Sequence, residues 1–116
     1  MSKRTENMLR IAAEVAKLEK RGRTFLLGAV AYRKDGALIA SPNGFPIIPN
    51  ALSHAEARLC RKIDSADTVY IARVSRENGT WQMAKPCMQC VIFMRAKKIK
   101  RAIYTITEGE YGGMIL

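Results

Sequence analysis

The chain contains little cysteine and histidine, and it lacks any long apolar run. Three cysteines and one histidine are present among 116 residues. An odd number of cysteines argues against a framework of disulfides and favours a reducing compartment, where thiols can bind a metal. No apolar run approaches the roughly 18 residues of a membrane span, and the charged amino-terminal stretch has no apolar signal-peptide core. We therefore expect a cytoplasmic protein without a membrane partner.

Acidic residues are also scarce, because 10 Asp and Glu face 20 Lys and Arg and leave a net charge of +10. The excess is concentrated in residues 1–34, with nine basic and three acidic residues, and in residues 85–101, with six basic residues and no acidic one. Two such segments favour an anionic partner, namely a nucleotide phosphate, RNA or single-stranded DNA. Basic side chains that merely solvate helix surfaces would give the same pattern, and charge alone does not separate the two.

The length of the chain predicts one domain, residues 1–116, with a single core. Apolar residues at helical spacing predict a first helix, and Asp35-Gly36 between two apolar runs predicts a hairpin. The expected elements are a helix at 3–20, strands at 25–32 and 37–40, a loop at 41–50, a helix at 54–63, a strand at 68–74, a helix at 86–97, a strand at 101–106, and a tail with one turn at Gly112-Gly113 and a stub of strand. This order predicts an α/β sandwich with a mixed sheet.

The single histidine belongs to a pattern that can hold a metal ion. His54 is followed two residues later by Glu56, and residues 86–90 read Pro-Cys-Met-Gln-Cys. Zinc binds imidazole nitrogen and thiolate sulfur in a tetrahedron, and three protein ligands leave the fourth position for water. His54, Cys87 and Cys90 are the candidate ligands, and predicted helix starts at both places favour the negative charge of thiolates. Glu56 is the candidate catalytic residue, because a carboxylate there can take up and deliver the proton of an activated water.

Three other interpretations of these residues stay open. Ser53 and Glu56 fit a capping box, in which Glu56 is only structural. The Cys-x-x-Cys pair also suits a redox dithiol, although no thioredoxin-like pattern surrounds it. A closed structural zinc site needs a fourth ligand, and Cys60 is the one spare cysteine. It lies about 240° around the helix from His54, so we expect Cys60 to be a buried apolar residue instead.

Two further segments accompany the metal pattern. Residues 43–46 read Asn-Gly-Phe-Pro ahead of the histidine, and residues 98–104 form a basic turn into a predicted strand. Together with the His-x-Glu and Pro-Cys-x-x-Cys spacing, they resemble the zinc-dependent cytidine/deoxycytidylate deaminase family, and most of all its deoxycytidylate branch. The resemblance implies a three-layer α/β/α cytidine deaminase-like fold with a mixed sheet of four to five strands, shortened at the C-terminus. It also implies one zinc ion per chain.

The resemblance assigns roles to residues around the metal. Asn43 would hydrogen-bond the sugar or the base, and the backbone N–H of Ala55 would hold the pyrimidine carbonyl. Gly28 and Ala29 would pack beside the base, and Arg23 is the candidate for binding a phosphate. Turn chemistry is the competing explanation for Asn43, and a plain surface charge is the competing explanation for Arg23.

The implied function is hydrolytic deamination of a cytosine nucleotide, with dCMP converted to dUMP as the first candidate. Tyr111 is a candidate for stacking on the base, and we expect a homo-oligomer in which a neighbouring copy completes the pocket. The alternative is deamination of a base within a polynucleotide, either tRNA adenosine or single-stranded cytosine, which the net charge and the short tail favour. A third hypothesis is a non-catalytic nucleic-acid-binding protein with structural zinc.

Overall fold

The computed structural model describes residues 3–18, 25–33, 35–42, 55–60 and 67–116, and the side chains of residues 25 and 56–58 lie outside that description. None of the helices in these ranges has the length and apolar character needed to span a bilayer. His54, Asn43 and Arg23 lie outside the described residues, so their predicted roles stay predictions.

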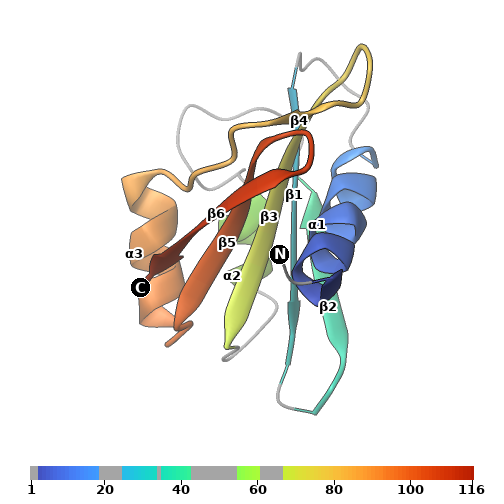
Figure 1. The fold of residues 1–116 in the computed structure, drawn as a ribbon. Coiled ribbons are helices and arrows are strands. Elements are labelled where there is room, and N and C mark those ends of the chain that lie inside the picture. The colour runs from blue at the N-terminus through green and yellow to red at the C-terminus, as the bar shows by residue number, and fades with distance from the viewer. Residues whose placement is uncertain (1–2, 19–24, 34, 43–54, 61–66) are drawn as a thin grey trace.

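Three helices and six strands make up the described chain, with the strands in one mixed sheet (Figure 1). The strand order is β2-β1-β3-β5-β6, and β4 pairs with β3 outside this path. Only β3 and β5 pair in parallel, and the remaining pairs are antiparallel. In chain order the elements are α1 (Lys3–Ala16), β1 (Phe25–Tyr32), β2 (Leu38–Pro42), α2 (Ala55–Cys60), β3 (Thr68–Ser75), β4 (Trp81–Gln82), α3 (Met88–Ala96), β5 (Arg101–Thr107) and β6 (Glu110–Ile115).

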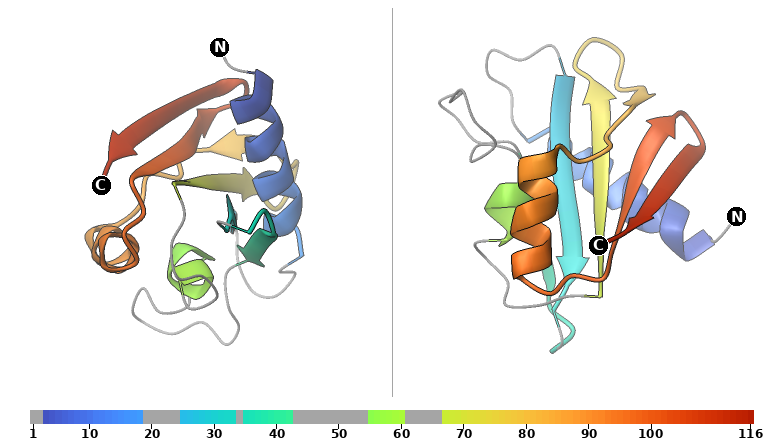
Figure 2. Two further views of the ribbon diagram at one scale, coloured as in Figure 1. Left: turned by 90° about the horizontal axis from the view of Figure 1, so that it is seen from below. Right: turned by 90° about the vertical axis from the view of Figure 1, so that its left-hand side faces the viewer.

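The sheet separates two layers of helix, α1 on one face and α2 with α3 on the other (Figure 2). Successive side chains of a strand point to opposite faces, and β1 is apolar on both. Leu26 and Val30 pack in the core beneath α1, whereas Ala29 and Ala31 pack in the core beneath α2 and α3. The predicted three-layer α/β/α architecture with a mixed sheet is therefore confirmed.

The C-terminal tail differs from the prediction. It forms the full strand β6, which pairs antiparallel with β5 from Arg101 onward, and the turn lies at Glu108 and Gly109 instead of at Gly112-Gly113. Gly112 lies inside β6, where a Cβ would be 2.9 Å from Cζ of Tyr104 in β5. The sheet accordingly has six strands rather than four to five, and β6 forms its edge beside β5.

The short strand β4 was also missing from the predicted order. Its Trp81 is buried against α1, and the guanidinium carbon of Arg10 lies 5.7 Å from the centroid of the Trp81 ring. A two-residue strand is below the length at which alternation in the sequence can be recognised.

Gly28 allows α1 to lie directly on the sheet. A Cβ at this position would collide with the backbone oxygen of Ala12 and would lie 2.6 Å from the backbone nitrogen of Ala16. Both contacts are with helix backbone, which cannot move aside as a flexible side chain can. The absence of a side chain in β1 thus sets the distance between α1 and the sheet.

We predict that Gly28→Ala lowers the free energy of unfolding by about 1–3 kcal/mol, because the added methyl group pushes α1 off the sheet. Chemical denaturation measures this change. Gly113→Ala is the matched control, since its Cβ would meet the oxygen of Ala102 only at 3.7 Å, and it should change stability by less than about 0.5 kcal/mol. Equal effects of the two substitutions would contradict the close approach of α1.

Candidate active site

Strand directions determine where α2 and α3 begin. β1 runs antiparallel to both β2 and β3, while β3 runs parallel to β5. β2, β3 and β5 therefore point the same way, and the chain between them must return across the sheet. α2 and α3 belong to these two returning segments and cover the same face (Figure 2). We infer that both helices begin beside the carboxyl ends of the strands, where open α/β folds bind their ligands.

The two cysteines of the Cys-x-x-Cys pattern lie in the first turn of α3. Cys87 is the N-cap residue, with extended backbone (φ −72°, ψ 165°) and an exposed side chain, and its carbonyl accepts the N–H of Val91 at 3.0 Å. Cys90, three residues later, is fully buried. None of the three cysteines in the chain forms a disulfide. The helix start therefore presents one thiol at the surface and one beneath it.

The segment before α3 is fastened to β5 by Thr105. This side chain is fully buried, and its hydroxyl accepts the backbone N–H of Arg73 at 3.1 Å and donates to the carbonyl of Gln82 at 2.7 Å. The carbonyl of Thr105 in turn accepts the N–H of Ala84 at 2.9 Å. These bonds fix the chain three residues before Cys87, so Thr105 is a positioning residue for the cysteines.

The starts of α2 and α3 share one hydrophobic core. Ala55, the first residue of α2, is fully buried in the same cluster as Cys90 and Ala29. Cys60 belongs to this cluster as well and is 4% exposed, which confirms the prediction that it is a buried apolar residue. Residue 56 occupies the second position of α2, one residue after Ala55.

Gly28 and Ala29 lie on opposite faces of the sheet, so only one of them can pack beside a base bound near Ala55. Ala29 faces the core that contains Ala55, whereas the α-carbon of Gly28 faces the backbone of α1. This geometry favours Ala29, and the role of Gly28 beside a base stays a prediction.

The same geometry bears on the candidate stacking residue. Tyr111 of β6 packs against the core beneath α1, whereas Cys90 lies in the core on the other face of the sheet. Tyr104 of β5 packs against the core beneath α2 and α3. Among the tyrosines that the structure describes, it is the one that packs against this core. The sequence analysis did not single out Tyr104. It lies two residues after the buried Ala102, so the alternation of side chains along a strand places the two residues on the same face.

The described residues fit part of a zinc site. Within the described ranges no three His, Cys, Asp or Glu side chains gather, and His54 falls outside these ranges. Cys87 and Cys90 supply two soft sulfur donors in one helical turn, which is the donor type that zinc accepts beside imidazole. This donor set suits the ion that the sequence pattern predicts.

The fold defined by these elements is that of the cytidine deaminases. A cytidine deaminase from Burkholderia pseudomallei aligns with a TM-score of 0.68 at 15% identity, covering 99% of this chain and 93% of that one. The enzyme from Mycobacterium leprae gives 0.60 at 18% identity over 88% and 91% of the two chains. That from Mycobacterium tuberculosis gives 0.57 at 16% identity over 89% and 87%. No family model and no curated protein matches the sequence.

We predict that Thr105→Val lowers the free energy of unfolding by about 1–3 kcal/mol, because it leaves the N–H of Arg73 and the carbonyl of Gln82 without this partner. Amide hydrogen exchange at Ala84 should also accelerate. Thr107→Val is the matched control on the same strand, since the Thr107 hydroxyl is exposed and bonds only the carboxylate of Glu110 at 3.2 Å. Unchanged exchange at Ala84 in Thr105→Val would contradict the positioning role.

Proposed function

We propose that the protein hydrolytically deaminates a cytosine base, so that water replaces the amine at C4 and uracil and ammonia are formed. The observation that carries this proposal is the placement of Cys87 and Cys90 at the start of α3, with Cys90 in one core with Ala55 at the start of α2. The cytidine deaminase fold supports it. The same placement speaks against a purely structural role for the Cys-x-x-Cys pair, because Cys60 is buried at the other end of α2.

His54, Cys87 and Cys90 would hold one zinc ion, which would supply a water that ionises near neutral pH. The remaining work falls to side chains of the chain itself. We assign Glu56 two proton transfers, one from the attacking water to the ring nitrogen and one from the resulting C4 hydroxyl to the departing amine. The backbone N–H of Ala55 would hold the pyrimidine carbonyl, and Ala29 would pack beside the ring.

The substrate is proposed to be a free cytosine nucleotide or nucleoside. The Asn-Gly-Phe-Pro segment that contains Asn43 favours dCMP, with Arg23 as the candidate cation for its phosphate. The structural neighbours are named as cytidine deaminases, which makes cytidine the second candidate. The two differ in the phosphate, so turnover of matched nucleoside and nucleotide pairs decides between them.

We predict about one zinc ion per chain in the purified protein, measured by elemental analysis. Cys87→Ser should lose the metal, because serine oxygen is a poor replacement for a thiolate ligand. Cys60→Ala is the matched control and should keep it, since Cys60 lies in the apolar core. Metal loss in Cys60→Ala would instead indicate a closed structural site.

We predict that Glu56→Gln lowers kcat for deamination by about 10²–10⁴-fold while zinc content stays constant, as expected for loss of a general acid–base. Glu14→Gln, an exposed glutamate on α1, is the control and should be fully active. The assay measures the deaminated base, uracil from cytosine or hypoxanthine from adenine, in reactions with dCMP, CMP, deoxycytidine, cytidine, single-stranded DNA and tRNA. Product from the polymers alone would contradict a free nucleotide substrate, and full activity of Glu56→Gln would contradict the mechanism.

A further inference from the structure

A basic hollow lies at the C-terminal end of α3, at the opposite edge of the sheet from the cysteines. Its volume is about 690 Å³, and it is lined by Arg95, Lys98, Ile99, Lys100, Ile115 and Leu116. We call this the α3-end hollow. Among the described residues, its three cations form no ion pair, and no acidic side chain lines it. Three cations around one hollow produce a local positive potential that attracts anions. The hydrogen bond from Arg101 is the largest cause of the lowered pKa of Asp67, although the charge of Lys100 also acts on that carboxyl and helps to lower its pKa.

Lys98 adopts a backbone conformation that lysine does not favour. The N–H of Lys98 bonds the oxygen of Arg95 at 2.9 Å, and the N–H of Ile99 bonds the oxygen of Met94 at 3.1 Å. These two bonds form a Schellman motif, whose C′ position is usually glycine. Here Lys98 has φ of +60° and is the one non-glycine residue with positive φ in the described chain. Left-handed backbone is unfavourable for a residue with a Cβ, so Lys98 places a charged side chain where glycine would be more stable.

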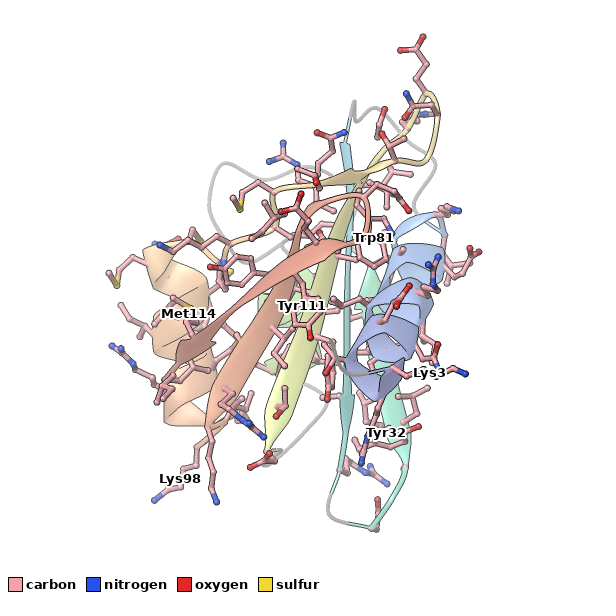
Figure 3. The ribbon with its side chains drawn as sticks, in the orientation of Figure 1. Lys3, Tyr32, Trp81, Lys98, Tyr111 and Met114 are labelled. Atoms are coloured by element: carbon pink, nitrogen blue, oxygen red, sulfur yellow. The ribbon has the colours of Figure 1, made fainter. Side chains whose placement is uncertain are left out.

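A second hollow of about 260 Å³ lies around the same edge of the sheet, on the face that carries α1. Its lining consists of Arg4, Tyr32, Asp67, Thr68, Tyr70 and Arg101. We call this the tyrosine hollow. Lys98 and Tyr32 both lie toward the lower end of the molecule in Figure 3. Lys100 and Arg101 are consecutive residues that line one hollow each, so the two hollows lie on either side of the start of β5.

The charges in the tyrosine hollow leave Arg4 as its available cation. Arg101 donates to the carboxylate of Asp67 at 2.9 Å, and the Thr68 hydroxyl donates to it at 3.1 Å. The hydrogen bond from Arg101, followed by that from Thr68, holds the pKa of Asp67 below its ordinary value. Arg101 is thereby neutralised by its partner, and the hollow presents two tyrosine rings beside Arg4.

We propose that this edge binds single-stranded nucleic acid, with backbone phosphates in the α3-end hollow and an unpaired base in the tyrosine hollow. Cations that follow a backbone, combined with aromatic rings on which bases stack, are the physical basis of single-strand binding. α3 has nine residues and is about 13 Å long at 1.5 Å per residue. This surface is therefore separate from the proposed zinc site and does not depend on the proposed deamination.

Fluorescence anisotropy of a labelled oligomer of about 12 thymidines tests the proposal, because thymine has no amine to remove and the length suits a single-strand site. The dissociation constant of the full chain is measured across a series of salt concentrations. We expect Lys98→Gly combined with Lys100→Ala to remove two phosphate contacts and to reduce the salt slope by about 1.4. That change weakens binding about 25-fold near 0.1 M salt. Lys98→Gly alone should weaken binding while it raises the melting temperature, so weaker binding cannot be attributed to misfolding.

Lys17→Ala is the matched charge control, because Lys17 lies just after the other end of α1 and pairs with Glu14 at 3.2 Å. It should bind as the unaltered protein does. Tyr32→Leu should weaken binding about fivefold or more with the salt slope unchanged, since it removes stacking and no charge. The proposal is overturned if the oligomer does not bind, if the double variant binds like the unaltered protein, if Lys17→Ala is equally impaired, or if a duplex of the same length binds as tightly.

Discussion

The parallel pairing of β3 with β5 is the constraint on which the rest of the site depends. Two adjacent parallel strands cannot be joined by a tight turn, so the chain must cross back over the sheet, and α3 is that crossing. Its start is consequently fixed beside the carboxyl end of β3, and Cys87 is the N-cap residue of the helix. Thr105 adds precision, because its buried hydroxyl and carbonyl hold the segment between β4 and α3 against β5.

The two faces of the sheet carry different features of the molecule. Its α2 and α3 face carries Ala29, Ala55 and Cys90 in one core, next to the proposed zinc ligands. Its other face is occupied by α1, which approaches closely because Gly28 has no side chain. Two opposite edges of the sheet differ as well, because Cys87 and Cys90 lie at one edge and the two hollows lie at the other. One face and one edge are thus available for chemistry, while the remaining surfaces stabilise the fold or present charge.

Much of this arrangement could be predicted from the sequence, and the failures have identifiable physical causes. Helix periodicity, the Asp35-Gly36 hairpin turn and the Cys-x-x-Cys at a helix start are local signals, and the structure contains each of these elements. Gly112 was misread because a glycine inside a strand and a turn glycine look alike in the sequence until the partner strand is known. The face that Tyr111 occupies likewise depends on how β6 pairs with β5. The Thr105 bonds join residues 23 and 32 positions apart, and no local pattern in the sequence indicates them.

The central claim is that this fold brings one histidine and two cysteines together around an open zinc position. X-ray diffraction at the zinc absorption edge, on crystals of the purified protein, tests it most directly. The account predicts one anomalous peak between the starts of α2 and α3, bonded to His54, Cys87 and Cys90, with the fourth position not filled by a protein side chain. A peak bonded to a fourth protein ligand, or located away from these two helix starts, would contradict the account.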